Sequence, residues 1–121
     1  MHTSSKFFKG TKDFSAFRAS DCGAQSTIRS IKKVELEKVD RNLLVLIVEG
    51  KGFLKNMIRI MAGTIAEVGK GKRDFTEIEK IIKSKDRLNA GITAPAYGLF
   101  LNRVKYEEGK IWITSLALNL L

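Results

Sequence analysis

Cysteine, histidine and proline are nearly absent from this 121-residue sequence, which contains Cys22, His2 and Pro95 as its only examples. A single cysteine excludes a disulfide within the chain, and one cysteine with one histidine cannot build a zinc site. A lone histidine near the N-terminus also leaves no Ser-His-Asp set to assemble. We therefore expect no metal site, and a reducing cytoplasm is the simplest compartment.

Long hydrophobic runs are missing as well. The only long apolar-rich stretch extends over residues 53–68. Four polar or charged residues interrupt it, namely Lys55, Asn56, Arg59 and Glu67. A membrane span needs about 20 predominantly apolar residues, so this stretch does not qualify. The first six residues have no apolar signal core. We expect no membrane partner.

The glycine-rich loops that hold phosphates or dinucleotides are also lacking. Gly50-Lys51-Gly52 and the 69–72 segment are too short and lack the residues that should follow. The aspartates are scattered and lie in turns or at predicted helix ends, where capping explains them (Asp13, Asp21, Asp40, Asp74 and Asp86). The sequence therefore predicts neither a cofactor nor a self-contained active site.

Basic residues, by contrast, are abundant. Lys and Arg number 22 against 13 Asp and Glu, which gives a net charge of +9 and a pI of about 9.9. Such an excess attracts polyanions, and we favour nucleic acid over a merely solvated surface or an anionic membrane. The candidate RNA-binding residues form one group around the long helix and a second group (Lys51, Lys55, Lys70, Lys72 and Arg73; then Arg18, Arg29 and Lys32).

The first half of the sequence predicts a short helix and a β-hairpin. Residues 13–17 read as a helix that is capped by Thr11 or Asp13 and buries Phe14 and Phe17. Residues 28–39 alternate as a strand does, and the apolar run 43–48 predicts a strand buried on both faces. A tight connection over residues 40–42 completes the hairpin.

The second half predicts two helices and two strands. Residues 53–68 have helical periodicity, with Gly69 at the C-cap. Thr76 and Glu79 form a capping box for a second helix that ends near Ser84. Residues 99–106 and 111 onward read as strands joined by a turn at 107–109. The fold class predicted is α+β, a mainly antiparallel sheet with helices packed on one face.

Arg59 is the one polar position for which a functional role explains the pattern as well as an ordinary solvated helix face does. It lies between apolar pairs in the long helix and shares a face with Lys55, Asn56 and Gly63. A guanidinium on a rigid helix can clamp a carboxylate or phosphate through two parallel hydrogen bonds. A glycine at position 63 disfavours the helix by about 1 kcal/mol relative to alanine, so we expect close backbone contact there.

Four segments in order resemble the TruA family of tRNA pseudouridine synthases. Residues 9–18 are similar to its G-x-x-D-F-S-x-F-R segment. At the right distance after them come Cys22 and then residues 28–31, which are similar to the family's R-x-I strand. Residues 52–64 resemble F-L-x-x-M-V-R-x-x-x-G. The fourth segment is residues 87–106, in which residues 94–106 resemble A-P-A-x-G-L-x-L-x-x-V-x-Y. Four segments in order across residues 7–106 are highly specific, although none is decisive alone.

The resemblance implies an isomerase that converts uridine to pseudouridine in the anticodon arm of tRNA without a cofactor. Arg59 matches the family's active-site arginine, which is thought to pair with the catalytic aspartate and keep it ionised. Leu99 or Leu101 is similar to the apolar residue under the target base, and strand core explains either leucine equally well.

The departures from the family pattern imply half of a synthase. The nucleophilic aspartate lies in a G-R-T-D segment of the family's N-terminal half, and these 121 residues contain no such segment. We expect residues 1–106 to form the family's C-terminal domain, half of the pseudouridine synthase fold, and residues 107–121 to be a divergent strand or tail. The expected partners are tRNA, the missing N-terminal half and a second copy of the chain in a homo-oligomer such as a dimer. One reading is an enzyme half that is inactive alone. The alternative is a non-catalytic basic domain that binds RNA or self-assembles.

Overall fold

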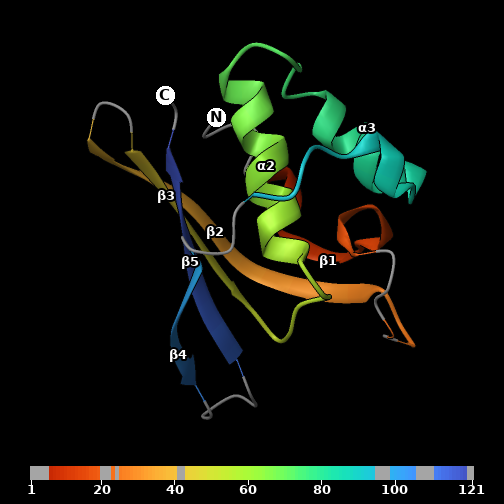
Figure 1. The fold of residues 1–121 in the computed structure, drawn as a ribbon. Coiled ribbons are helices and arrows are strands. Elements are labelled where there is room, and N and C mark those ends of the chain that lie inside the picture. The colour runs from red at the N-terminus through yellow and green to blue at the C-terminus, as the bar shows by residue number, and fades with distance from the viewer. Residues whose placement is uncertain are drawn as a thin grey trace.

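One antiparallel sheet with helices on one face makes up the described part of the protein. The computed structural model describes residues 6–19, 23, 25–40, 43–94, 99–105 and 111–119. Its sheet has five strands in the order β1-β2-β3-β5-β4, and helices α2 and α3 pack against the same face (Figure 1). The predicted α+β class is confirmed.

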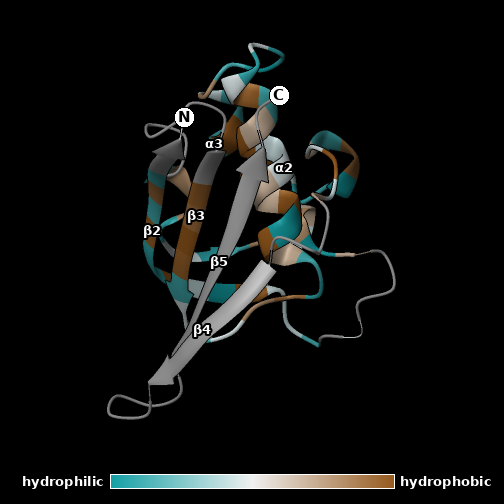
Figure 2. Cartoon of the chain, turned by 60° about the vertical axis from the view of Figure 1, so that its left-hand side comes forward, coloured by the Kyte–Doolittle hydropathy of each residue, from teal (hydrophilic) through white to brown (hydrophobic). Residues whose placement is uncertain are grey.

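The predicted hairpin is present as strands β2 (Ile28–Asp40) and β3 (Leu43–Gly50), which pair antiparallel. Residues 41 and 42 of the predicted tight connection lie outside the described residues. The expectation that β3 is buried on both faces is wrong in part. Leu46 and Val48 are fully buried, whereas Val45 and Ile47 are half-buried, because the helices cover only one face of the sheet (Figure 2).

The two C-terminal strands are confirmed, and the last one occupies the interior of the sheet. Strand β5 (Ile111–Asn119) pairs with β3 along all of β3 and with β4 (Leu99–Lys105) on its other side. The predicted turn at 107–109 lies outside the described residues. The division at residue 106 stays a prediction, although β5 covers the edge of β3 within the same chain.

Helix α2 (Met57–Gly69) is the central helix, and it begins four residues later than predicted. The chain enters it through Asn56 in a left-handed conformation (φ 61°), and Phe53 packs beside the core from outside the helix. The helix buries nearly all of its first two turns, including Met57, Ile60 and Met61. Among the described residues, no helix is long and apolar enough to cross a membrane.

The predicted C-cap at Gly69 is wrong by two residues. Gly69 is the last helical residue, and Gly71 adopts the left-handed conformation with φ 78°. The amide of Gly71 donates to the carbonyl of Val68 (3.1 Å), and the amide of Lys72 donates to that of Glu67 (2.9 Å). Glycine at 71 satisfies the last helical carbonyls because it has no Cβ to oppose this conformation.

The capping box of helix α3 (Glu77–Ser84) is also shifted by two residues. The side chain of Asp74 accepts from the amide of Thr76 (3.2 Å), and the side chain of Glu77 accepts from the amide of Asp74 (2.8 Å). Thr76 makes no side-chain cap. This reciprocal pairing is that of a capping box. Asp74 takes the position usually held by Ser or Thr, because a carboxylate oxygen also accepts a hydrogen bond from a backbone amide.

The predicted helix over residues 13–17 is a single 3-10 turn, η2 (Ser15–Phe17), which follows strand β1 (Gly10–Asp13). Thr11 is a strand residue and does not cap the turn; it faces Ser30 of β2. The burial of Phe14 and Phe17 is confirmed, and Phe17 meets the ring of Phe8 edge-on at 5.1 Å.

Asp13 organises this turn through its carboxylate. Its Oδ1 accepts from the hydroxyl and the amide of Ser15 and from the hydroxyl of Thr27 (2.7 Å). The hydrogen bond from the Ser15 hydroxyl, followed by that from Thr27, lowers the pKa of Asp13 below its ordinary value. These bonds favour the ionised form, so they stabilise the fold only while Asp13 is charged.

We therefore predict a pH-dependent effect of Asp13→Asn. A lowered folded-state pKa contributes stability above the unfolded value of about 3.9, and this contribution is lost as pH falls through the folded pKa. At pH 7 the free energy of unfolding of the variant should be about 1–3 kcal/mol lower than that of the parent. Urea denaturation should find that this difference shrinks below about pH 4. If the difference in the free energy of unfolding is the same at pH 7 and pH 3, the role given to the ionised Asp13 is wrong. The control variant is Glu79→Gln, at an exposed position of α3.

Candidate functional site

The candidate site is built where the 86–94 segment lies along helix α2. The segment contains the 3-10 turn η3 (Arg87–Asn89) and then runs extended to Ala94. Its amide at Ala94 donates to the carbonyl of Arg59 (3.0 Å), and Gly91 lies against Thr64. The earlier residue of the segment, Gly91, contacts the later helix residue Thr64, and Ala94 contacts the earlier helix residue Arg59. The segment and the helix therefore run antiparallel.

Two glycines allow this contact at backbone distance. A Cβ added at Gly63 would overlap the carbonyl oxygen of Ile92 and lie 2.8 Å from its carbonyl carbon. A Cβ added at Gly91 would lie 2.8 Å from the Cα of Thr64. The close backbone approach expected at Gly63 is therefore confirmed.

Hydrogen bonds fasten the 86–94 segment to the helix. The buried hydroxyl of Thr64 donates to the carbonyl of Ile60 (2.8 Å) and accepts from the amide of Gly91 (2.9 Å). Arg73 pairs with Glu67 (2.5 Å) and donates to the carbonyl of Asn89 (2.7 Å). Helix α2 thus holds the segment along most of its length.

Arg59 is held at the end of this contact. Its Nε donates to the carbonyl of Ala94 (2.7 Å), and its Nη1 donates to Oδ1 of Asn56 (3.1 Å). The side chain is half-buried, so it is not an ordinary solvated residue. Within the described ranges no carboxylate forms an ion pair with it. A guanidinium has five N–H donors, so it keeps capacity for an anion.

The leucines proposed to contact the base lie in strand β4. The backbone of Leu99 pairs with Leu116, and that of Leu101 pairs with Thr114. Their side chains are outside the described part, as are residues 95–98, which join Ala94 to the strand. A role for either leucine at the target base stays a prediction.

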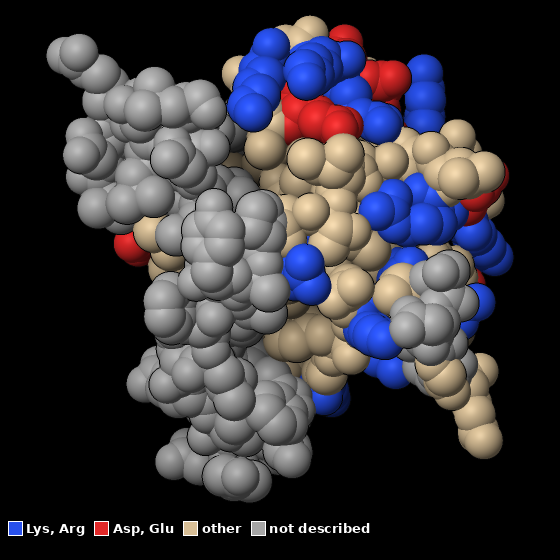
Figure 3. All heavy atoms as spheres, viewed as in Figure 1, with Lys and Arg blue, Asp and Glu red and all other residues tan. Residues whose placement is uncertain are grey.

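The first group of RNA-binding candidates is divided by helix α2. Lys51 and Lys55 precede the helix, and Lys70 and Lys72 follow it; all four side chains are exposed. A helix of 13 residues is about 20 Å long, so these pairs lie at opposite ends. Figure 3 shows Lys and Arg side chains gathered over the loop between α2 and α3. The guanidinium of Arg73 is occupied by Glu67 and the 86–94 segment.

The second group is divided as well. Arg29 donates to the carbonyls of Ser26 (2.7 Å) and Ile28 (2.8 Å), and Lys32 is exposed on β2. Arg18 instead lines a hollow of about 260 Å³ with Lys85 and Arg87. Arg18 therefore lies apart from Arg29 and Lys32, which both belong to strand β2.

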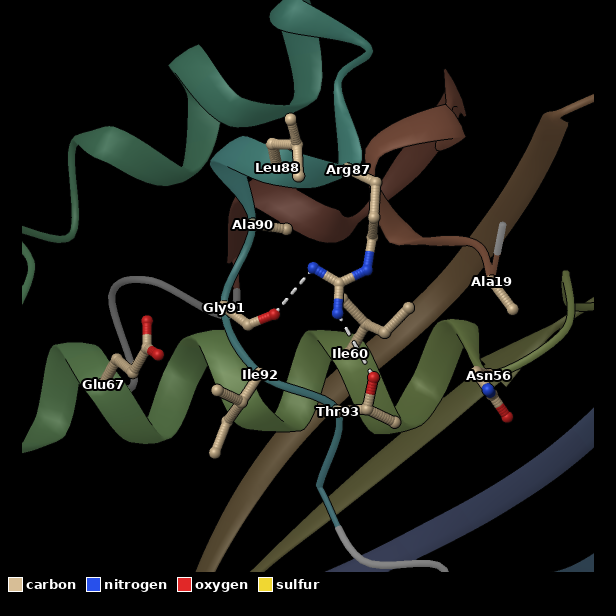
Figure 4. A pocket seen from close by; sticks show the side chains of 10 residues that line it. All are labelled: Ala19, Asn56, Ile60, Glu67, Arg87, Leu88, Ala90, Gly91, Ile92 and Thr93. Atoms are coloured by element: carbon tan, nitrogen blue, oxygen red, sulfur yellow. Dashed lines mark hydrogen bonds between the residues drawn. The ribbon is translucent and has the colours of Figure 1, made fainter. Parts of the chain in front are cut away.

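A larger open pocket of about 600 Å³ lies where the 86–94 segment runs along helix α2 (Figure 4). Asn56, the partner of Arg59, lines it together with Arg87 and Thr93. Its remaining lining residues are Ala19, Ile60, Glu67, Leu88, Ala90, Gly91 and Ile92. Sequence reasoning missed this pocket. The only signal was Arg87, which begins the segment leading to the fourth family motif and was assigned no role.

Metal-binding clusters of three or more His, Cys, Asp or Glu are not found among the residues that the structure describes. The basic and amide side chains around Arg59 are suited to bind an anionic group.

Comparison with known proteins places the site in a family context. A family model described as tRNA pseudouridine synthase matches residues 5–107. The chain is 46% identical over 106 residues to tRNA pseudouridine synthase A of Geotalea uraniireducens, and 47% identical over 106 residues to that of Acetivibrio thermocellus. These alignments each cover 88% of this chain and 43% of the relative. The Myxococcus xanthus relative is 41% identical over 109 residues, which cover 90% of this chain and 41% of that protein. The chain therefore spans about two fifths of the length of the curated relatives it matches.

Proposed function

Because this chain belongs to the TruA family of tRNA pseudouridine synthases, we propose that it supplies the arginine-bearing part of an enzyme that isomerises uridine to pseudouridine in the anticodon arm of tRNA. The observation that carries the proposal is the fixed guanidinium of Arg59. Ala94 and Asn56 hold it in place, and its remaining donors are directed at no carboxylate of the described residues.

Arg59 has the chemistry to orient a catalytic aspartate contributed by another part of the synthase. A guanidinium binds a carboxylate through two parallel hydrogen bonds and stabilises its ionised form. An aspartate kept ionised in this way is ready to act as the nucleophile. Within these 121 residues, Asp13 is occupied by Ser15 and Thr27, and Asp86 caps η3 through the amide of Leu88.

We predict that the 121-residue chain alone does not form pseudouridine on tRNA. No described carboxylate pairs with Arg59, so none of the described carboxylates is positioned by it as a nucleophile for the uracil ring. Tritium release from tRNA labelled at C5 of uridine measures the reaction. Addition of the N-terminal part of a related synthase, in trans or by fusion, should restore turnover. Turnover by the isolated chain would contradict this assignment of the nucleophile.

We also predict that the chain binds tRNA in a strongly salt-dependent way. If four to six phosphates are neutralised, the slope of log K against log salt should lie between about −3 and −5. Lys70→Gln combined with Lys72→Gln should flatten this slope by about 1.5, because two contacts are lost. Fluorescence anisotropy measures the slope of the parent and of the double variant. The salt range is roughly 25 to 200 mM, over which phosphate contacts weaken. A flat titration of the parent chain would contradict phosphate binding by these lysines.

The protein partners we propose are the remaining part of the synthase and a second copy of this chain. Among the described strands, β1 and β4 are the edges of the sheet. Edge strands carry unpaired backbone groups that can recruit another strand. Since β5 already covers β3 within the chain, a strand from a partner would have to pair at β1 or β4. The proposed compartment is the cytoplasm, where tRNA is modified.

A further inference from the structure

A groove along the 86–94 segment has no role in the function proposed so far. The pocket of about 600 Å³ and the hollow of about 260 Å³ adjoin, because Ala19 and Arg87 line both of them. Figure 4 shows Arg87 reaching down between Ala19 and the 86–94 segment. We call the pocket and the hollow together the Arg87 groove. Its volume is in the range of sites that hold small molecules, about 300–1,000 Å³.

The charges along the Arg87 groove favour an anion. Arg18 and Lys85 line its outer end, and Arg87 lies where the two hollows meet. The two acidic residues that line the groove already have partners, and Lys85 makes a largely exposed ion pair with Asp13 (3.9 Å), which water screens. Asp86 accepts from the amide of Leu88 (3.0 Å), and Glu67 pairs with Arg73. The groove is therefore complementary to phosphate groups.

Arg87 is also rigidly placed. Its Nη1 donates to the carbonyl of Gly91 (2.9 Å), and its Nη2 donates to the hydroxyl of Thr93 (3.2 Å). These two bonds orient the guanidinium plane. Proteins recognise single-stranded RNA by stacking bases on such guanidinium planes and on aromatic side chains. Two exposed apolar residues of the same segment supply further contact area, since Leu88 is 89% and Ile92 is 67% exposed.

Asn56 connects the Arg87 groove to the proposed catalytic position. The residue lines the groove, and its Oδ1 accepts from Arg59. A strand of RNA whose target nucleotide lies at Arg59 would therefore have its neighbouring nucleotide at the mouth of the groove. We propose that the Arg87 groove binds this neighbouring nucleotide, with its phosphate near Arg18 and Lys85 and its base against Arg87 and Leu88. The inference rests on the proposed function.

The first test removes the phosphate-binding charges. The probe is a labelled tRNA anticodon stem-loop bound to the 121-residue chain, with anisotropy followed against salt. Arg18→Gln combined with Lys85→Gln should weaken binding and flatten the log–log slope by about 1.4, since two single-strand contacts are lost. The matched control is Lys9→Gln combined with Lys33→Gln, which removes the same charge from exposed positions away from the groove. The control should leave the slope within error of the parent.

The second test places a charge where the base should lie. Leu88 is almost fully exposed, so neither Leu88→Glu nor Leu88→Gln should disturb the fold, and thermal melting checks this. Leu88→Glu should weaken RNA binding because its charged carboxylate would lie where the base is expected to pack, and it would lose its water there without gaining a partner. Leu88→Gln should retain most of the affinity, because it changes polarity without adding charge.

The outcomes separate this inference from the function on which it rests. Suppose that the parent chain binds the stem-loop, but that the Arg18→Gln/Lys85→Gln variant and the Leu88→Glu variant each bind it as tightly as their control variants do. The groove is then not an RNA site, and the proposed function stands. If the parent chain binds no stem-loop at 25 mM salt (roughly the low-salt limit at which phosphate contacts are strongest), the tRNA-binding function itself fails. Loss of affinity in both variants but not in their controls supports the Arg87 groove.

Discussion

Arg59→Ala should abolish most turnover of a reconstituted synthase while tRNA affinity falls only modestly. The assay joins this chain to the N-terminal part of a related synthase and follows tritium release from labelled tRNA. A single positioned donor in an enzyme site contributes about 10²–10³-fold to kcat. We expect a loss of this size, because the carboxylate that Arg59 orients would lose its partner. Affinity should change little, because one phosphate-type contact among several is removed.

Arg59→Lys distinguishes geometry from charge. The ammonium group preserves the positive charge but cannot form the two parallel bonds of a guanidinium, so only part of the rate should return. Asn56→Gly is a matched control, since it removes one of the groups that hold Arg59, leaves the arginine in place and suits the left-handed backbone at this position. It should reduce kcat less than Arg59→Ala does. Near-normal turnover of Arg59→Ala would overturn the assignment of this residue even though the family membership holds.

Gly63→Ala should destabilise the protein although alanine is the better helix former. On an exposed helix face the change would stabilise by about 1 kcal/mol. Here the added methyl would overlap the carbonyl oxygen of Ile92, and the contact is with backbone. Overpacking of this kind lowers stability by about 1–3 kcal/mol. Urea denaturation of the 121-residue chain measures the effect.

The same substitution should also reduce turnover of the reconstituted enzyme. If the 86–94 segment moves away from α2, the carbonyl of Ala94 leaves Nε of Arg59, and the guanidinium loses its orientation. Gly69→Ala, at the exposed end of the same helix, is the matched control and should leave stability unchanged or slightly raised. Shortening Ile92 to alanine should not rescue Gly63→Ala, because the overlapping atom is a backbone oxygen. Rescue by Ile92→Ala, or unchanged stability of Gly63→Ala, would contradict the proposed contact.

Several features of the fold could be predicted because they are local in the chain. Strand alternation, helical periodicity and turn residues are properties of neighbouring residues, so the hairpin of β2 and β3 and the two helices were found near their observed positions. The end signals were less accurate. Both the cap at Gly71 and the box of Asp74 and Glu77 lie two residues from the predicted positions, since several residues nearby carry equally suitable chemistry.

The sequence by itself determined the family, the α+β class and the position of Arg59 within a helix, because motifs and periodicity are written in consecutive residues. Only the tertiary structure decided which residues meet. It placed β5 between β3 and β4, a pairing that local pattern does not encode. It also engaged Arg73 in an ion pair with Glu67 and laid the 86–94 segment on α2, which fixes Arg59 and forms the Arg87 groove. Residues such as Arg18 and Arg87 are 69 positions apart in sequence, and only packing can bring them to one surface.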